Sequence, residues 1–382
     1  MMARFRKPLI LLAKLAVTVG LLGWVVSRAH WHDYAVAPDG REVRVLDHQP
    51  GRLLVATADG PKWRPAGPFQ PLQGRVVRPG LAAALTHLRP GPFALAAVVL
   101  LAQVTLMGVR WWYLMRFQRV GVGLWATVRL MFIGQFFNFF LPGSTGGDVI
   151  RAYLVTRRTG RRAVAVATVL LDRFVGLAGM ALLAGVMTLV TWGKPETRRA
   201  AEAVGVTVLV IAAAGLVLFS RRTGRLLRLD RLLARLPRRE AFRAALGTFQ
   251  DLPRSPGPAA VAGAMTIGVH LLLATGIALM GLALGLPRGL VPVGHYFLFV
   301  PVIYIVAAIP VSIGGLGVIE GMYLVFFAQS SGADSSQVLA MALLARFTPM
   351  ALSLPGLAFW LAERGARRAA PEAEARTRGG AP

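Results

Sequence analysis

Ionisable residues lie inside long apolar runs, where a charge needs either a partner or a wet cavity. Asp172 and Arg173 interrupt one run, and Arg346 interrupts the last one. A charge near the centre of a bilayer costs at least about 2.5 kcal/mol on insertion scales. We therefore expect Asp172 to pair with Arg173 or Arg151, and Glu320 to pair with Arg346. Such pairs are either purely structural or part of a site for a charged head group or a coupling proton.

The pattern P-x-S-x-G-G occurs twice, at residues 142–147 and at residues 310–315. Each copy follows an apolar run and precedes another helix-like segment. Proline ends the incoming helix, and the paired glycines allow tight or left-handed backbone conformations. Ser144, Thr145 and Ser312 would cap the outgoing half-helices, whose exposed amides and positive dipole ends favour an anion. The alternative is a pair of glycine-packed helix breaks without a ligand.

The elements that must hold these residues are membrane helices. The chain has 382 residues, of which 55% are hydrophobic and only 16% charged, with 43 Lys+Arg against 17 Asp+Glu. An average soluble domain has about a quarter of its residues charged. The basic residues lie between apolar runs, which favours a polytopic membrane protein over a nucleic-acid binder. The absence of cysteine excludes disulfides, thiolate zinc sites and cysteine nucleophiles.

Several apolar runs approach the length of about 20 residues that a membrane span needs. The candidates are residues 9–26, 93–109, 124–141, 163–192, 204–219, 259–286, 291–309, 318–328 and 338–361. The first run follows Arg4, Arg6 and Lys7 and lacks a good small-residue cleavage site. We therefore expect an uncleaved signal anchor there rather than a cleaved signal peptide.

Clusters of arginine constrain the topology, because such clusters are expected on the cytoplasmic side. They are Arg110, Arg116, Arg119 and Arg129 after the second run, a cluster at 151–162, and ten arginines in the loop 221–258. All three can be cytoplasmic only if the run 124–141 enters the membrane, turns at the first P-x-S-x-G-G motif and returns. The second motif is then approached from the outer side.

Two interrupted segments of opposite topology in corresponding places are typical of an inverted-repeat transporter. The predicted fold class is therefore an all-α polytopic integral membrane protein with inverted repeats and two re-entrant, Pro/Gly-broken segments. A small β-rich extracytoplasmic insert completes this prediction.

The predicted domains are an N-terminal signal-anchor helix (1–29), the extracytoplasmic insert (30–90), a transmembrane domain (91–362) and a disordered cytoplasmic tail (363–382). The insert has strand-like alternation at 42–47 and 53–57, with a turn at Asp59 and Gly60. An insert of about 60 residues is marginal for an independent core, so we expect it to lean on the membrane domain. Within the basic cytoplasmic loop 221–258, leucines at helical spacing favour an interfacial helix or a solvated linker helix.

Three ordered blocks resemble the signature of the lysylphosphatidylglycerol synthase transmembrane family, also called flippase-like domain proteins. They are residues 134–151, 170–173 and 309–320, and the resemblance covers roughly residues 91–362. It implies a membrane region that, in the best-understood relatives, moves an aminoacylated phospholipid to the outer leaflet. Other members are associated with lipid-linked sugars. The insert 30–90 lies outside the family's core pattern.

The lipid-aminoacylating members of that family carry a further soluble C-terminal aminoacyltransferase domain. This sequence ends about twenty residues after its last apolar run. We therefore expect that the chain does not make lysyl-phospholipid and is not an enzyme. It also contains no HExxH, Walker A, GxGxxG or GxSxG motif.

The predicted function is that of a lipid flippase or translocase of the inner (cytoplasmic) membrane, with both termini cytoplasmic. Its substrate would be an anionic, aminoacylated or polyprenyl-linked lipid, moved by a gradient or by downstream consumption. Expected partners are membrane lipids with an anionic or polyprenyl-phosphate head group, and a cell-envelope enzyme is a further candidate. No nucleic acid, cofactor, metal or catalytic residue is expected. The alternatives are an intramembrane transferase acting on a lipid-linked head group, with Asp148, Asp172 or Glu320 as base, and a non-transporting scaffold.

The hypothesis places the substrate site where the two turns meet near the midplane of the membrane. Its arginines would hold a phosphate, and its carboxylates would pair with them, meet a cationic head group or carry a proton. The predicted substrate-binding residues are Asn138, Pro142, Ser144, Thr145, Gly146, Gly147, Asp148, Arg151, Asp172, Arg173, Pro310, Ser312, Gly314, Gly315, Glu320 and Arg346.

Overall fold

The computed structural model describes residues 2–72, 75–141, 146–198, 256–286, 291–309 and 311–364, together with 201–202, 204–206, 209–210 and 213. Most of the predicted apolar segment 204–219 and nearly all of the basic loop 221–258 lie outside these residues. The predicted tail lies outside them too, except for Glu363 and Arg364. Among the predicted site residues, Pro142, Ser144, Thr145 and Pro310 fall outside the described part.

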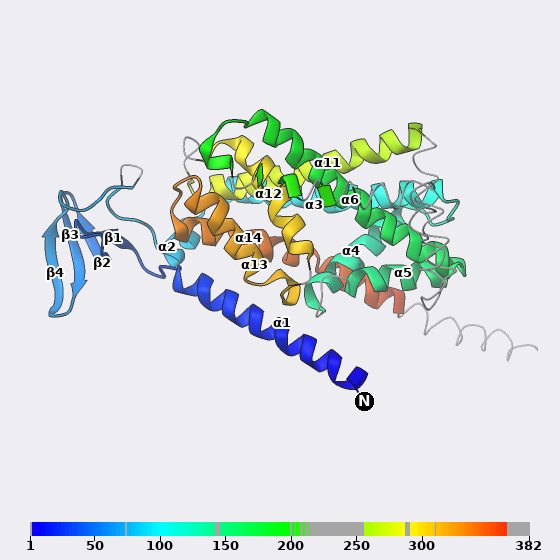
Figure 1. Ribbon diagram of the computed structural model, residues 1–382, viewed down its shortest axis with the longest axis horizontal. Coiled ribbons are helices and arrows are strands. Elements are labelled where there is room, and N and C mark those ends of the chain that lie inside the picture. Colours follow the sequence, from blue (N-terminus) through cyan, green and yellow to red (C-terminus); the bar gives the residue numbers. More distant parts are fainter. Residues whose placement is uncertain are drawn as a thin grey trace, which may run out of the picture. The chain divides into compact units, whose positions relative to one another are not determined.

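The described chain is helical apart from one small sheet (Figure 1). The helices are α1 (Met2–Ser27), α2 (Leu81–Thr86), α3 (Pro90–Phe117), α4 (Leu124–Phe140), α5 (Gly146–Thr159), α6 (Arg162–Val190), α11 (Pro256–Ala283), α12 (Val293–Ala308), α13 (Val318–Tyr323) and α14 (Ser335–Leu352). Short 3₁₀ turns occupy Pro195–Thr197 and Ile313–Gly315, and a π-helical segment occupies Leu324–Gln329. The strands are β1 (Tyr34–Val36), β2 (Glu42–Gln49), β3 (Arg52–Thr57) and β4 (Gly60–Pro65).

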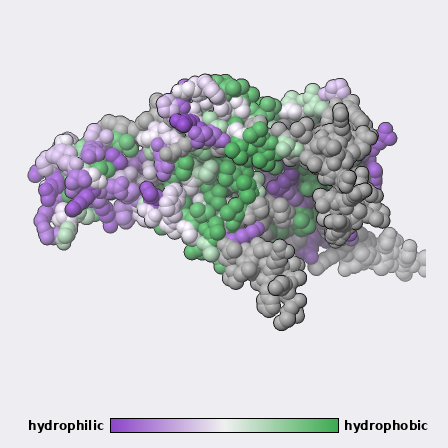
Figure 2. Space-filling model, in the orientation of Figure 1, coloured by the Kyte–Doolittle hydropathy of each residue, from purple (hydrophilic) through white to green (hydrophobic). Residues whose placement is uncertain are grey.

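Four helices within the described residues are long and apolar enough to cross a membrane: Pro90–Phe117, Arg162–Val190, Pro256–Ala283 and Ser335–Arg364. Four shorter apolar helices accompany them: Lys14–Ser27, Leu124–Phe140, Val293–Ala308 and Val318–Gln329. A helix suits the interior of a membrane because it satisfies its backbone hydrogen bonds internally. Figure 2 shows hydrophobic residues gathered over the helices and hydrophilic residues over the sheet. The chain is therefore an all-α polytopic membrane protein with a small sheet near its N-terminus, as predicted.

Helix α3 extends past the end that the apolar run predicts. The run stops at Val109, but the helix continues to Phe117 and includes Arg110. The sequence placed Arg110 in a cluster expected on the cytoplasmic side, and the structure shows that Arg110 itself is buried, with only 2% of the residue exposed. The helix can continue through the charge because a buried carboxylate neutralises it, as described below.

The chain divides into two compact units. Unit 1 comprises Met1–Val98, Ala184–Val204 and Ala274–Phe347, and unit 2 comprises Val99–Leu183, Gly205–Leu273 and Thr348–Pro382. The first P-x-S-x-G-G motif belongs to unit 2, and the second belongs to unit 1. Each unit therefore carries one copy of the repeated turn.

The sheet of unit 1 has the strand order β1-β2-β3-β4 and is antiparallel throughout. Strands β2 and β3 confirm the two predicted strands, and the pairing of Thr57 with Gly60 confirms the predicted turn. Strand β4 was not predicted, because its exposed sequence lacks apolar alternation. The Tyr34 hydroxyl donates a hydrogen bond to Asp334 Oδ2 (2.8 Å) just before α14. The insert thus leans on the helical part of its unit, as its small size suggested.

Helix α1 packs directly against the second repeated turn, also within unit 1. The backbone N–H of Ile313 donates to Thr18 Oγ1 (3.0 Å). Gly317 has a φ of +77°, and a Cβ placed on it would lie 2.5 Å from the Cβ of Leu21 and 3.0 Å from its backbone carbon. This position therefore requires glycine both for its left-handed conformation and for the close approach of α1. Helix α1 is consequently an integral part of unit 1.

This contact predicts that Gly317→Ala destabilises the protein by about 2 kcal/mol or more, from the left-handed conformation and the overlap together. The matched control is Gly20→Ala in α1, where nothing lies within 4 Å of the added methyl group. That change should be neutral or slightly stabilising, because alanine favours helix. The midpoint of thermal unfolding in detergent measures both effects. Equal midpoints for the two variants would contradict the close packing of α1 on the turn.

Candidate functional site

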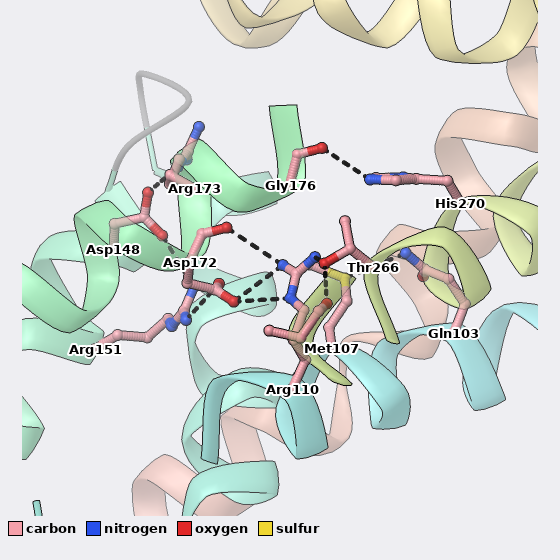
Figure 3. Close-up of polar contacts among 11 residues, drawn as sticks. Gln103, Met107, Arg110, Asp148, Arg151, Asp172, Arg173, Gly176, Thr266 and His270 are labelled. Carbon is pink, nitrogen blue, oxygen red and sulfur yellow. Dashed lines mark hydrogen bonds and ion pairs between the residues drawn. The ribbon is translucent and has the colours of Figure 1, made fainter. Parts of the chain in front are cut away.

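Five charged side chains of unit 2 form one connected cluster, which we call the arginine–aspartate network (Figure 3). Arg110 comes from α3, Asp148 and Arg151 come from α5, and Asp172 and Arg173 come from α6. Four of these five residues were predicted as site residues. The structure therefore brings together charges from helices that are far apart in the sequence.

The buried half of the network is centred on Asp172. Arg110 donates to Oδ1 of Asp172 from Nη2 (2.9 Å) and Nε (3.1 Å). Arg151 donates to Oδ2 from Nη2 (3.0 Å). All three residues are at most 4% exposed. Both carboxylate oxygens are therefore held by guanidinium groups, and of the two partners predicted for Asp172 the structure shows Arg151.

The outer half of the network is centred on Asp148. Arg151 Nη1 lies 3.2 Å from Oδ1 of Asp148, and Arg173 Nε contacts Oδ2. The side chain of Asp148 is 12% exposed and that of Arg173 is 35% exposed. Arg173 thus pairs with Asp148 rather than with its sequence neighbour Asp172. Adjacent residues point about 100° apart around a helix, so α6 directs these two charges to different partners.

Counted over the described residues, the network is not electrically balanced. It contains three arginines and two aspartates, so its formal charge is one unit positive. The buried half is saturated with ion pairs, whereas the end at Arg173 is partly exposed. An additional anion would therefore be attracted most strongly at that end.

Close packing of α5 on α4 fixes Arg151. The backbone N–H of Gly147 donates to Asn138 Oδ1 (2.9 Å), and a Cβ on Gly147 would overlap the carbonyl of Gly134. The same Gly134 leaves room for the side chain of Arg151. The guanidinium of Arg151 lies 3.9 Å from the ring centroid of the buried Trp111, a cation–π contact. Asn138 and Gly147 therefore serve to position Arg151.

Helix α11 completes the surroundings of Arg110. Thr266 Oγ1 accepts a hydrogen bond from Arg110 Nη1 (3.3 Å), and His270 Nε2 lies 2.9 Å from the carbonyl oxygen of Gly176 on α6. The sequence did not identify Arg110, Trp111 or Thr266 as site residues. One signal was available for Arg110, because residues 111–115 resume an apolar sequence directly after it.

The second predicted ion pair is found in unit 1. Arg346 Nε lies 2.5 Å from Glu320 Oε1, which confirms the predicted pair. The other two nitrogens of Arg346 donate to the carbonyls of Gly314 and Gly315, each at 3.1 Å. Glu320 Oε2 accepts the backbone N–H of Gly317 (2.8 Å). This cluster is charge-balanced and ties α14 to the repeated turn.

One expectation for the second turn was wrong. Ser312 does not cap the outgoing helix, and its buried hydroxyl has no hydrogen-bond partner among the described residues. Helix α13 begins after Gly317, and the side chain of Glu320 caps it by accepting the backbone N–H of Gly317. The amides of Ile313 and Gly317 are not open to an anion, since Thr18 and Glu320 already accept them. Arg346, which was expected to hold a phosphate, donates to carbonyl oxygens of the turn.

These helices and buried ion pairs define a polytopic membrane protein with a charged site inside its membrane helices. Residues 79–356 match the family model of the lysylphosphatidylglycerol synthase TM region, and the chain belongs to this family. The family is a flippase-like membrane domain that is not itself catalytic. The match contains both repeated turns and all five network residues. A search of curated proteins finds no match.

The geometry predicts that Asp172→Asn is the most destabilising single neutralisation in the network. It leaves Arg110 and Arg151 buried without their shared countercharge, which costs roughly 3–5 kcal/mol. Asp148→Asn, at the more exposed end, should cost clearly less. The double variant Asp172→Asn with Arg110→Met should recover part of the loss, because it removes one uncompensated charge. Thermal unfolding in detergent gives the ranking, and an Asp148→Asn variant as unstable as Asp172→Asn would contradict it.

Proposed function

We propose that this protein moves an anionic lipid across the membrane and that the arginine–aspartate network binds the lipid's head group. The observation that carries the proposal is the unbalanced positive charge of the network, buried among membrane helices and partly exposed at Arg173. A purely structural cluster has no need of a third arginine. A phosphodiester carries one negative charge and would neutralise the excess.

Arginine suits this role because its planar guanidinium donates several hydrogen bonds to phosphate oxygens. In the proposed binding step, Arg173 turns from Asp148 to the phosphate. Asp148 keeps its contact with Arg151, and its carboxylate then faces the bound head group. That placement would also suit the amino group of an aminoacylated lipid. A polyprenyl-linked phosphate is the other lipid class that the same arginine would hold.

The two halves of the network have different tasks in this proposal. Asp172, Arg110 and Arg151 form a rigid base whose pairs stay closed during transport. The outer pair of Asp148 and Arg173 opens and closes with the substrate. The balanced pair of Glu320 and Arg346 holds the second turn in shape.

The two repeated turns support an inverted-repeat transporter, in which movement of one repeat against the other alternates access. The proposal includes a location in the inner membrane with both termini cytoplasmic, which the arginine-rich segments support. A gradient or consumption of the product would drive net movement, because the sequence has no ATP-binding motif. The following experiment also distinguishes this proposal from the transferase and scaffold alternatives.

The test is transport of fluorescent phosphatidylglycerol in reconstituted vesicles, read from its accessibility to a quencher added outside. We expect Arg173→Gln to lower the transport rate at least about tenfold, because the variant loses a charge-assisted contact of roughly 1.5–3 kcal/mol. The matched control is Arg198→Gln, which removes an arginine paired with Glu202 on the surface. That control should transport at the wild-type rate.

Equal transport by wild type and Arg173→Gln, with both proteins folded, would overturn the assignment of the site. Conversion of the head group by the purified protein would favour the transferase. Absence of transport by the wild type with anionic, aminoacylated and polyprenyl-linked lipids alike would favour the scaffold.

A further inference from the structure

A group of exposed arginines in unit 2 lies outside the network and has no role in the proposed transport step. It belongs to the ends of α3, α5 and the helix 355–364 and to the start of α6. We call this group the basic rim, and its members are Arg116, Arg119, Arg157, Arg158, Arg161, Arg162 and Arg364.

Two contacts join these helix ends into one surface. Arg161 Nη1 donates to the backbone carbonyl of Arg119 (3.3 Å), which connects the start of α6 with the end of α3. Arg158 Nη2 pairs with Glu363 Oε1 (2.8 Å), which connects α5 with the last helix. Because Arg158 and Arg161 are three residues apart in the chain, the two contacts make the rim one continuous feature of the unit.

Three rim arginines lie over aromatic rings on three different helices. Arg116 lies 5.4 Å from the centroid of Trp112, Arg157 lies 5.8 Å from that of Tyr153, and Arg364 lies 4.5 Å from that of Trp360. Tryptophan and tyrosine gather at the level of lipid head groups. An arginine stacked on such a ring is held at the same level, with its donors available to phosphate.

Within the described part of unit 2, few acidic residues compensate the charge of the rim. Glu363 is its one acidic neighbour among the described residues, and that carboxylate is used by Arg158. The other acidic residues in the described part of unit 2, Asp148 and Asp172, belong to the network. Seven arginines against one glutamate leave a strong positive surface, which attracts anions within about one Debye length.

The spacing along the helices relates the rim to the membrane. Six residues separate Arg110 from Arg116 on α3, about 9 Å of helix, and ten separate Arg162 from Asp172 on α6, about 15 Å. Half of the hydrocarbon core is about 15 Å thick. Helix α6 therefore places its end of the rim at the interface when the network lies near the middle of the membrane, whereas Arg116 on α3 lies about 6 Å short of that level.

We propose that the basic rim binds the head-group phosphates of anionic lipids in the leaflet that it faces, which the positive-inside rule makes the cytoplasmic one. The stacked aromatic rings favour a lipid surface over a soluble acidic protein, because Trp112 and Trp360 lie at the ends of helices that are long and apolar enough to cross a membrane. Lipid binding by the rim does not depend on transport. Only its consequence, a local enrichment of substrate beside the network, rests on the proposed function.

The experiment compares spin-labelled phosphatidylglycerol with spin-labelled phosphatidylcholine in vesicles that contain the full-length protein. The fraction of each lipid immobilised by the protein gives their relative association. The rim variant is the triple change Arg116→Gln, Arg157→Gln and Arg364→Gln. The matched control is Arg44→Gln, Arg52→Gln and Arg64→Gln, three exposed arginines of strands β2, β3 and β4.

We expect wild type and control to prefer phosphatidylglycerol at least about twofold at low salt, because each interfacial arginine attracts anionic lipid. The rim variant should lose most of this preference, and added salt should weaken it in the wild type. A rim variant that keeps the wild-type preference would overturn the proposal. So would a rim variant whose only loss is binding of an added soluble polyglutamate peptide.

The same vesicles separate this proposal from the transport proposal. Arg173→Gln should keep the lipid preference while losing transport. The rim variant should lose the preference yet still transport phosphatidylglycerol when that lipid is in excess. A preference lost equally in Arg173→Gln and the rim variant would contradict a separate lipid-binding rim.

Discussion

The shared pairing of Asp172 with Arg110 and Arg151 is the interaction on which unit 2 depends. A carboxylate and two guanidiniums inside membrane helices must be paired, because each alone is costly to desolvate. Helices α3, α5 and α6 must therefore present their charges to one another at the same level. The glycine contact between Gly134 and Gly147, which brings α5 onto α4, follows from this requirement.

The two units solve a similar problem with different electrical results. In unit 1, Arg346 satisfies its donors with Glu320 and two carbonyls of the repeated turn, and the cluster is neutral. In unit 2, a third arginine joins two aspartates, and the cluster keeps a positive charge. The second copy of the motif is therefore part of a neutral structural joint, whereas the first copy is followed in the sequence by Asp148 and Arg151 of the charged network.

The sequence could predict the pair of Glu320 with Arg346, whose members lie in apolar surroundings. For Asp172 it left Arg151 and Arg173 as alternative partners, and the structure shows Arg151. The sequence could not predict Arg110, because a charge at the end of an apolar run resembles a cytoplasmic helix end. Its partner lies 62 residues away in the chain. The role of Glu320 as the cap at Gly317 was also missed. The position of Glu320 depends on the left-handed conformation of the glycines before it, and the pattern P-x-S-x-G-G allows this conformation without requiring it.

Stability alone is a poor explanation for the arginine–aspartate network. Replacing buried ion pairs by well-packed apolar residues of similar volume is often neutral or stabilising. Membrane helices also associate well through small residues, as α4 and α5 do at Gly134 and Gly147. Five charged residues with an excess of one positive charge are therefore a cost that folding does not require. The partly exposed position of Arg173 places the excess where an anion from outside the protein can balance it.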